Sequence, residues 1–189
     1  MNRMPLVLLA VCCLAPVAAR ADCVSFTPRP ADLYDLSHGQ NYTWGVAPHW
    51  ADDQQVDAAV LYIENIRNWN DTANQLYVHL LEQAPLGVTA GSDTTSGDEF
   101  AAQGILLVTW LDLPAAAQDL SYTFSPAEVE ALETALDDDG QFALAFDPDC
   151  HLYNDGVRLD LCTSVIPEPS LLALLLVGMP AVVLRRRGR

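Results

Sequence analysis

The sequence predicts an all-β fold: an antiparallel β-sandwich, jelly-roll-like in type, that carries one short helix. About eight short apolar runs follow strand periodicity, and Gly, Pro, Asp or Asn residues bound them. Only one segment has the spacing of a helix. All fifteen aromatic residues fall between residues 22 and 164, which favours one folded domain over a disordered acidic chain.

Residues 1–21 have the parts of a secretory signal peptide in the expected order. A positive charge comes first, an apolar stretch follows over residues 5–16, and small residues stand at Ala19 and Ala21. This pattern predicts cleavage before Asp22. A buried N-terminal helix would not explain why the small residues lie at the end of the apolar stretch. We therefore expect export of a mature domain that begins at Asp22.

Six runs within residues 22–164 are the clearest predicted strands. In QVDAAVLYIENI (55–66) apolar residues occupy both faces, which is typical of a strand inside a sandwich. In NQLYVHLLE (74–82) the side chains alternate between two faces. The other four are GILLVTWLDL, DLSYTF, QFALAFD and GVRLDLCT, which start at residues 104, 119, 141 and 156. The polar segment 84–103 is predicted to be a long loop.

The predicted helix is SPAEVEALETALDDDG, residues 125–140. Ser125 is the expected N-cap, Pro126 the first helical residue, and Glu128 completes a capping box. Apolar residues recur at helical spacing at Val129, Leu132 and Leu136. Three aspartates at the end of the segment oppose the helix dipole. They either form a solvated turn or bind a ligand.

The chain ends in VIPEPSLLALLLVGMPAVVLRRRGR, residues 165–189. Its three parts are Pro167-Glu168-Pro169, an apolar run over residues 170–184, and an arginine cluster that includes Arg185, Arg186 and Arg187. The apolar run is short of the roughly twenty residues that cross a bilayer, but flanking apolar residues and snorkelling arginines lengthen its reach. We therefore predict a C-terminal transmembrane helix with the arginines on the inner side.

These three parts, in this order, resemble the PEP-CTERM sorting signal of Gram-negative bacteria; a plain tail anchor needs no Pro-Glu-Pro. The resemblance implies that signal peptidase and then an exosortase process a membrane-anchored precursor. The mature protein would then be released or re-attached at the cell surface. Proteins with this signal are commonly linked to exopolysaccharide and biofilm matrix. The resemblance covers residues 165–189 alone and implies no activity for the domain.

The predicted mature domain, residues 22–164, is strongly acidic. It holds 24 of the 25 acidic residues against three arginines, Arg29, Arg67 and Arg158, so its formal charge is about −21. Such a surface repels nucleic acid and anionic lipid. The expected partners are therefore divalent cations or neutral polymers such as exopolysaccharide, and not nucleic acid.

Three cysteines, Cys23, Cys150 and Cys162, belong to the predicted mature domain. Export into an oxidising compartment predicts one disulfide and one remaining thiol. Cys23 with Cys162 would join the two ends of the domain and is the favoured pair. The alternative is Cys150 with Cys162, which flank the turn-forming run Asn154-Asp155-Gly156, although bridges between neighbouring strands are geometrically demanding.

No catalytic motif occurs: the sequence has no G-x-S-x-G, no phosphate-binding glycine loop and no H-E-x-x-H. The four histidines are scattered, and His79 is interpreted as a core or sheet-face residue. We therefore predict no catalytic residue and expect a structural or polysaccharide-associated domain. Aromatic residues that could bind sugar are Trp44, Trp50, Trp69 and Tyr153. The alternative is a secreted hydrolase that cleaves polysaccharide with two carboxylates.

A predicted calcium site lies in FDPDCHLYNDGVRLDL, which starts at residue 146. Four oxygen-bearing side chains fall within nine residues: Asp147, Asp149, Asn154 and Asp155. Oxygen ligands suit calcium, although the spacing is not that of an EF-hand. The competing interpretation is that the first two aspartates cap backbone amides and that Asn154-Asp155-Gly156 is a hairpin turn. A second oxygen-rich segment, ENIRNWNDTAN (64–74), is interpreted as a turn.

Overall fold

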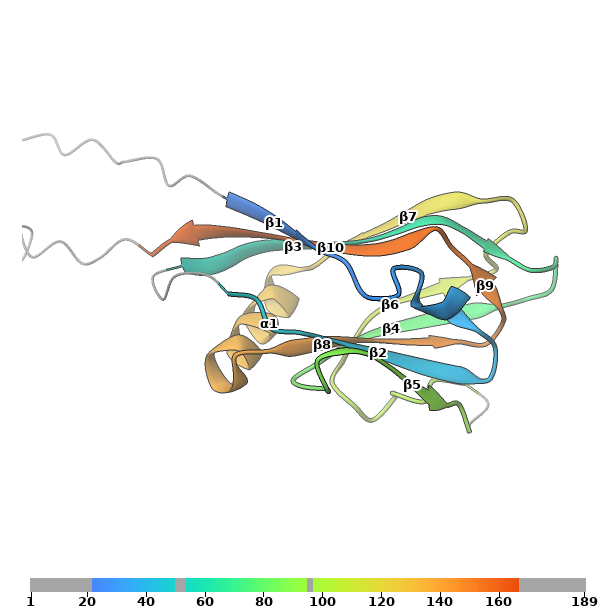
Figure 1. Cartoon of the computed structure of the whole chain (residues 1–189), viewed down its shortest axis with the longest axis horizontal. Helices are drawn as coiled ribbons and strands as arrows, with labels where there is room; N and C mark the ends of the chain where they lie inside the picture. The colour runs from blue at the N-terminus through green and yellow to red at the C-terminus, as the bar shows by residue number, and fades with distance from the viewer. Residues whose placement is uncertain (1–21, 50–53, 95–96, 167–189) are drawn as a thin grey trace, which may run out of the picture.

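The computed structural model describes residues 22–49, 54–94 and 97–166 as two antiparallel sheets that lie face to face, with α1 at one end (Figure 1). The first sheet has the order β1-β10-β3-β7, with β9 paired to β3, and the second has the order β5-β2-β8-β4-β6. The first consists of β1 (Asp22–Phe26), β3 (Gln54–Asn68), β7 (Gln118–Thr123), β9 (Leu152–Tyr153) and β10 (Gly156–Val165). The second consists of β2 (Gln40–Val46), β4 (Gln75–Leu81), β5 (Gly87–Ser92), β6 (Ile105–Leu111) and β8 (Phe142–Pro148). The prediction of an all-β, antiparallel fold with one helix is confirmed.

Strand β8 is buried at all seven positions because it is central in its sheet and is covered on both faces. Phe142, Leu144 and Phe146 belong to the main core between the sheets. Ala143 and Ala145 belong to a second, smaller apolar cluster, which Phe100 completes. Coverage of both faces explains why the strand sequence is nearly continuously apolar instead of alternating.

Strand β3 is the longest strand and runs between β10 and β7. Ala59, Leu61 and Ile63 are fully buried in the core, in agreement with the predicted face. Tyr62 is on the other face, where the Arg158 guanidinium lies 4.4 Å from its ring centre. An irregularity between Ile63 and Ile66 shifts the pairing with β7.

Helix α1 (Pro126–Asp139) forms as predicted, and both bonds of the capping box between Ser125 and Glu128 are present. Gly140 ends the helix in a left-handed conformation, with φ at 68°, and its N–H donates to the Leu136 carbonyl oxygen. The helix buries Val129, Leu132 and Ala135 against the sandwich. Its C-terminal aspartates, 137–139, are exposed.

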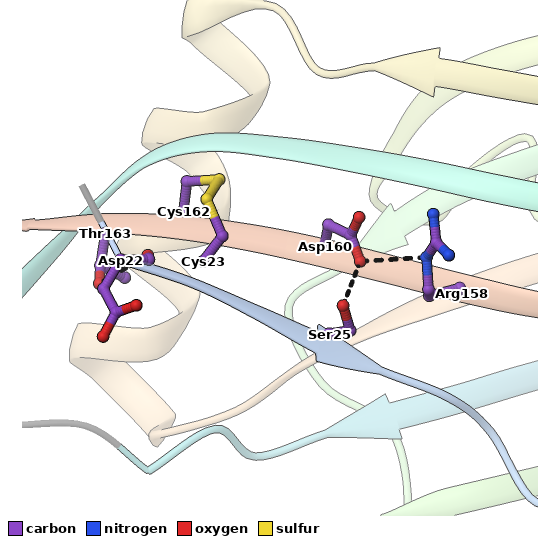
Figure 2. Close-up of a disulfide and its surroundings, with 7 residues drawn as sticks. All are labelled: Asp22, Cys23, Ser25, Arg158, Asp160, Cys162 and Thr163. Atoms are coloured by element: carbon purple, nitrogen blue, oxygen red, sulfur yellow. Dashed lines mark hydrogen bonds and ion pairs between the residues drawn. A yellow bond between two sulfur atoms is a disulfide. The ribbon is translucent and has the colours of Figure 1, made fainter.

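The terminal strands of the domain are neighbours, and a disulfide joins them (Figure 2). Cys23 of β1 pairs directly with Cys162 of β10, and the two sulfur atoms are 2.05 Å apart. The favoured pairing is therefore confirmed. The alternative partner, Cys150, is a half-buried free thiol.

Segment 84–103 is not entirely a loop, contrary to the prediction. Residues 87–92 form β5, which pairs along its full length with β2. Only half-buried Val88 of this edge strand packs against the core, so the segment lacks the apolar alternation that marks a half-buried strand. Residues 97–104 then cross the outer face of the second sheet, where Phe100 is buried.

The predicted signal peptide, residues 1–21, lies outside the described residues, as do residues 167–189 of the predicted sorting signal. Within the described ranges, no helix is both long enough and apolar enough to span a bilayer.

Candidate functional site

Strand β9 lies at the end of the sandwich opposite α1 (Figure 1). A surface pocket of about 400 Å³ includes Tyr153 of this strand in its lining. Three separate parts of the chain form it: the segment before β2, the β3–β4 connection, and the β8–β9 connection. Its lining residues are His38, Trp69, Asn70, Thr72, Cys150, His151 and Tyr153. Four of these side chains carry aromatic or imidazole rings: His38, Trp69, His151 and Tyr153.

Strand β9 holds the two exposed aromatic residues of the pocket in place. Leu152 is fully buried in the core, so the adjacent Tyr153 is directed outward and is 36% exposed. Trp69, the residue after β3, is 60% exposed, and its backbone N–H donates to the His151 carbonyl oxygen at 3.1 Å. The ladder between β3 and β9 thus brings Trp69 and Tyr153 to the same pocket.

The ring of Tyr153 is restrained by two neighbours. The Arg67 guanidinium carbon lies 5.2 Å from the ring centre, a cation–π arrangement. The His151 ring meets the Tyr153 ring edge-on, with 4.5 Å between their centres. An aromatic ring held in this way loses little conformational entropy when a ligand stacks on it.

Hydrogen bonds within the protein also fix the orientation of polar side chains in the pocket. The Asn70 side-chain oxygen accepts hydrogen bonds from the Thr72 N–H at 2.9 Å and from the Thr72 hydroxyl at 2.5 Å. His38 Nδ1 lies 3.1 Å from the Asp149 carbonyl oxygen. The Cys150 sulfur is 3.9 Å from the Thr72 hydroxyl. These contacts connect all three chain segments that line the pocket.

A left-handed turn precedes His38. The four residues of η1 (Leu33–Leu36) have φ values between 41° and 57°, although none is glycine. This conformation costs roughly 1–2 kcal/mol per residue, and burial of Leu33 and Leu36 in the core offsets the cost. Asn154 also holds the turn, because its side-chain N–H donates to the Asp32 carbonyl oxygen at 2.8 Å. Strain of this kind concentrates at functional sites.

The four aromatic candidates have different positions. Trp69 and Tyr153 are exposed in the pocket, whereas Trp44 is only 4% exposed and belongs to the core. Trp44 is therefore excluded as a contact residue. Trp50 lies outside the described residues.

The four predicted calcium ligands do not form one group. The Asp147 carboxylate accepts the Glu99 N–H, and the Asp155 carboxylate accepts the Asn65 side-chain N–H at 2.8 Å. The Asn154 side-chain N–H donates to the Asp32 carbonyl oxygen beside the η1 turn, whereas the Asp149 backbone N–H donates to the Gln75 carbonyl oxygen. The described part of the chain contains no group of three or more His, Cys, Asp or Glu side chains that could hold a metal ion.

The physical reason is the chain path between Asp147 and Gly156. Strand β8 belongs to the second sheet, whereas β9 and β10 belong to the first, so the segment crosses from one sheet to the other. Residues that are close in sequence therefore end on different sheets. For the same reason, Asn154-Asp155-Gly156 is not the turn of a hairpin between β8 and β10.

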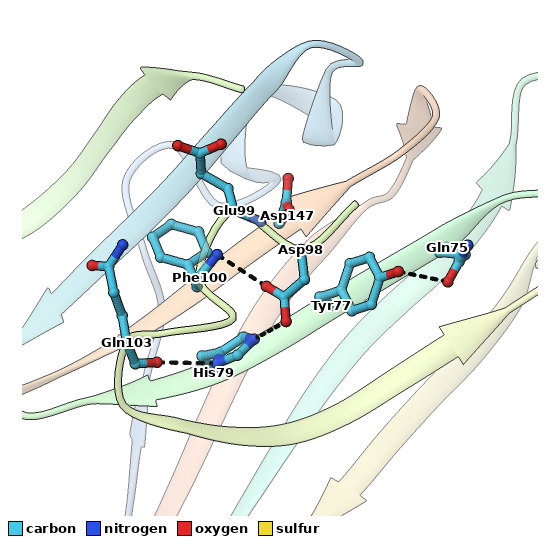
Figure 3. A network of polar contacts seen from close by, with 8 residues as sticks. All are labelled: Gln75, Tyr77, His79, Asp98, Glu99, Phe100, Gln103 and Asp147. Carbon is cyan, nitrogen blue, oxygen red and sulfur yellow. Dashed lines mark hydrogen bonds and ion pairs between the residues drawn. The ribbon is translucent and has the colours of Figure 1, made fainter. Parts of the chain in front are cut away.

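His79 is buried, as predicted, and takes part in a polar network on the outer face of the second sheet (Figure 3). Its Nε2 lies 2.9 Å from an Asp98 carboxylate oxygen, and its Nδ1 lies 3.2 Å from the Gln103 carbonyl oxygen. The Glu99 N–H donates to Asp147 at 2.7 Å. The network holds residues 97–104 against the sheet.

Asp147 is fully buried, and its second carboxylate oxygen has no hydrogen-bond partner. Burial raises the pKa of this carboxyl to about 6, and the nearby charges of Asp93, Asp149 and Asp98 act in the same direction. The hydrogen bond from Glu99 opposes the shift. Burial also raises the pKa of Asp149; the charges of Asp93 and Asp98 act in the same direction, and His38 opposes the shift.

Comparison with known proteins assigns no family. No protein-family model matches the sequence, and no curated protein matches it. Among solved structures, recombinantly expressed latent aurone synthase, a polyphenol oxidase, aligns with a TM-score of 0.41 and 14% identity over 70% of this chain and 25% of its own. The same enzyme from its natural source aligns with a TM-score of 0.37 and 11% identity over 77% and 24%. The chain thus spans about a quarter of these proteins, and similarity at this level supports no conclusion about function.

Proposed function

We propose that this protein is an exported surface or extracellular-matrix component whose domain binds neutral polysaccharide without cleaving it. The observation that carries the proposal is the pocket whose lining includes the exposed aromatic residues Trp69 and Tyr153 together with polar side chains. Sugar rings offer apolar C–H faces that stack on aromatic rings, and hydroxyls that hydrogen-bond to polar side chains. Concave sites with aromatic walls and a few oriented polar groups are typical of small-molecule recognition.

The charge of the domain supports a neutral ligand. Residues 22–164 carry about −21 formal charges, and a polyanion would be repelled as it approached. Two of the three arginines in this segment already have aromatic or acidic neighbours: Arg158 contacts Glu64 and Asp160, and Arg67 lies over Tyr153.

Export and sorting complete the proposal. Signal peptidase removes residues 1–21, the C-terminal helix anchors the precursor, and an exosortase processes it at the Pro-Glu-Pro triplet. Two structural features are consistent with the proposal. The described strands end at Val165, ahead of the Pro-Glu-Pro triplet at which an exosortase would act. The Cys23–Cys162 disulfide fits an oxidising compartment.

The strand order supports a jelly-roll assignment of the sandwich. When the short β9 and the edge strand β5 are set aside and the other eight are renumbered in chain order, the sheets read 1-8-3-6 and 2-7-4-5. This interleaving of two four-stranded sheets is the pattern of two Greek keys wound together. The pocket then lies among the connections at one end of the jelly roll.

The hydrolase alternative has one observation in its favour, the raised pKa of Asp147 among other carboxylates, which is a feature of general acids. However, Asp147 is fully buried, so a polymer could not reach it without displacement of residues 97–104. Release of reducing ends from a neutral polysaccharide, lost in Asp147→Asn, would support the hydrolase instead.

Binding can be tested with the full-length protein in mild detergent and immobilised neutral polysaccharides. We expect retention that is lost in Trp69→Ala and in Tyr153→Ala. Leu106→Ala is the control, because Leu106 is a large apolar residue that is 47% exposed but does not line the pocket. Equal retention of all four proteins would contradict the proposed site.

A further inference from the structure

We propose that Asn70 and His38 make this pocket selective for uncharged sugars, because Asn70 presents a hydrogen-bond donor and the neutral His38 ring presents an acceptor. This inference rests on the proposed polysaccharide binding and identifies the chemistry that the ligand must have.

The orientation of the Asn70 amide is determined by Thr72. A side-chain amide has one oxygen that accepts and one NH₂ that donates, and the two ends are interchangeable unless a partner distinguishes them. Here two donors of Thr72, its N–H and its hydroxyl, both bond to one end, at 2.9 and 2.5 Å. A backbone N–H can only donate, so that end is the oxygen. The NH₂ group is therefore left to donate to a ligand in the pocket that Asn70 lines.

The tautomer of the neutral His38 ring is determined by the Asp149 carbonyl oxygen. Nδ1 lies 3.1 Å from the Asp149 carbonyl oxygen, and a carbonyl oxygen can only accept. Nδ1 therefore carries the hydrogen. In the neutral imidazole, Nε2 then has a free lone pair and acts as an acceptor. His38 is exposed and lines the same pocket as Asn70.

A sugar hydroxyl satisfies both groups, because its oxygen accepts and its hydrogen donates. One hydroxyl can accept from the Asn70 NH₂ while another donates to His38 Nε2, with the ring stacked on Trp69 or Tyr153. A carboxylate cannot donate to His38, and its charge would be unfavourable near the acidic Asp149, whose backbone carbonyl oxygen lies 3.1 Å from His38 Nδ1. The expected ligand is therefore a polymer of uncharged sugars with free hydroxyls, and uronic acid polymers are disfavoured.

Asn70→Asp is a nearly isosteric test. The aspartate can still accept both bonds from Thr72, so the turn is retained, but it has no NH₂ group to donate. His38→Phe is the second variant: it keeps a ring at the position and removes the acceptor. Thermal melts of both variants, compared with that of the unmodified protein, control for a loss of folding.

The full-length protein in mild detergent is titrated with dextran, a soluble β-glucan and a galactomannan, and with carboxymethyl dextran as the charged counterpart. We expect binding to at least one neutral polymer, weaker binding to carboxymethyl dextran than to dextran, and at least a tenfold loss of affinity in each variant with an unchanged melting temperature. If Trp69→Ala loses binding while Asn70→Asp and His38→Phe bind normally, the selectivity inference is overturned and the proposed function stands. If no neutral polymer binds, the proposed function fails, and this inference fails with it.

Discussion

The buried Asp147 carboxyl should make the domain less stable as the pH rises from 4 to 7. In the folded state its pKa is raised to about 6, from an ordinary value of 3.8. Between these values the folded protein holds a proton that the unfolded chain has lost. Stability falls with increasing pH wherever the folded state binds more protons. The destabilisation is therefore absent below about pH 4, grows between pH 4 and 6, and is complete above the folded pKa.

The magnitude follows from the difference between the two pKa values. A difference of about two units corresponds to about 3 kcal/mol, since each unit is worth about 1.4 kcal/mol. The structural reason is that one carboxylate oxygen has a single N–H donor, from Glu99, while the other has no partner. The ionised form is thus poorly compensated in the folded state. Asp149 has a raised pKa as well and acts with the same sign.

Urea unfolding of residues 22–166 between pH 4 and 8 measures this effect, with Asp147→Asn as the comparison. The amide can accept the Glu99 N–H but does not ionise, so the variant should lack the Asp147 part of the pH dependence. We expect the free energy of unfolding of the variant, relative to the unmodified domain, to increase by about 3 kcal/mol from pH 4 to 8. Parallel pH profiles of the two proteins would refute the assignment of the shift to Asp147.

Three further predictions concern the covalent link, the helix and the tail. Replacing Cys23 and Cys162 with serine should lower the free energy of unfolding by about 5 kcal/mol in the chain-entropy approximation, because the disulfide closes a loop with a sequence separation of 139. Denaturant titration measures this loss, and an unchanged unfolding midpoint would contradict the prediction. Ser125→Ala removes the side-chain bond to the Glu128 N–H and should cost about 1 kcal/mol, whereas Ser125→Asp, which retains a capping acceptor, should cost much less in the same titration. Deletion of residues 167–189 should convert a membrane-associated precursor into a freely exported protein, as measured by fractionation; a truncated protein that stays with the membrane would exclude the tail as the anchor. Ala-Ala-Ala in place of Pro167-Glu168-Pro169 should cause the uncut precursor to accumulate.

Local features of the fold could be predicted because their causes are local. Helix α1 begins at Pro126 and ends before Gly140, as its capping residues indicate, since a cap acts on the backbone within a few residues. Strands β3 and β4 follow from alternation that is visible along the chain. Strand β5 escaped prediction because an exposed edge strand needs only the backbone of β2 as a partner and carries little apolar signal.

The site could be predicted only in part, because its residues come together through pairing between distant strands. Trp44 and Trp69 are the same residue type, yet the first lies between the sheets and the second lies beyond the end of β3. His38 and Cys150 have no sequence pattern that would link them to Asn70, and their positions depend on the left-handed turn and on the crossing between sheets.

Which acidic residues lie next to one another could not be predicted from the sequence either. Sequence composition alone accounts for the acidic character of the domain. The expectations of an exported, disulfide-bonded sandwich that does not bind nucleic acid also came from the sequence, through its motifs, periodicity and charge. Which carboxylates are neighbours depends instead on side-chain direction. Asp147 lies under residues 97–104, far along the chain, while Asp155 bonds to Asn65 on the other sheet. Proximity in sequence places residues within reach of one another, but in a sandwich the sheet to which each strand belongs decides whether their side chains meet.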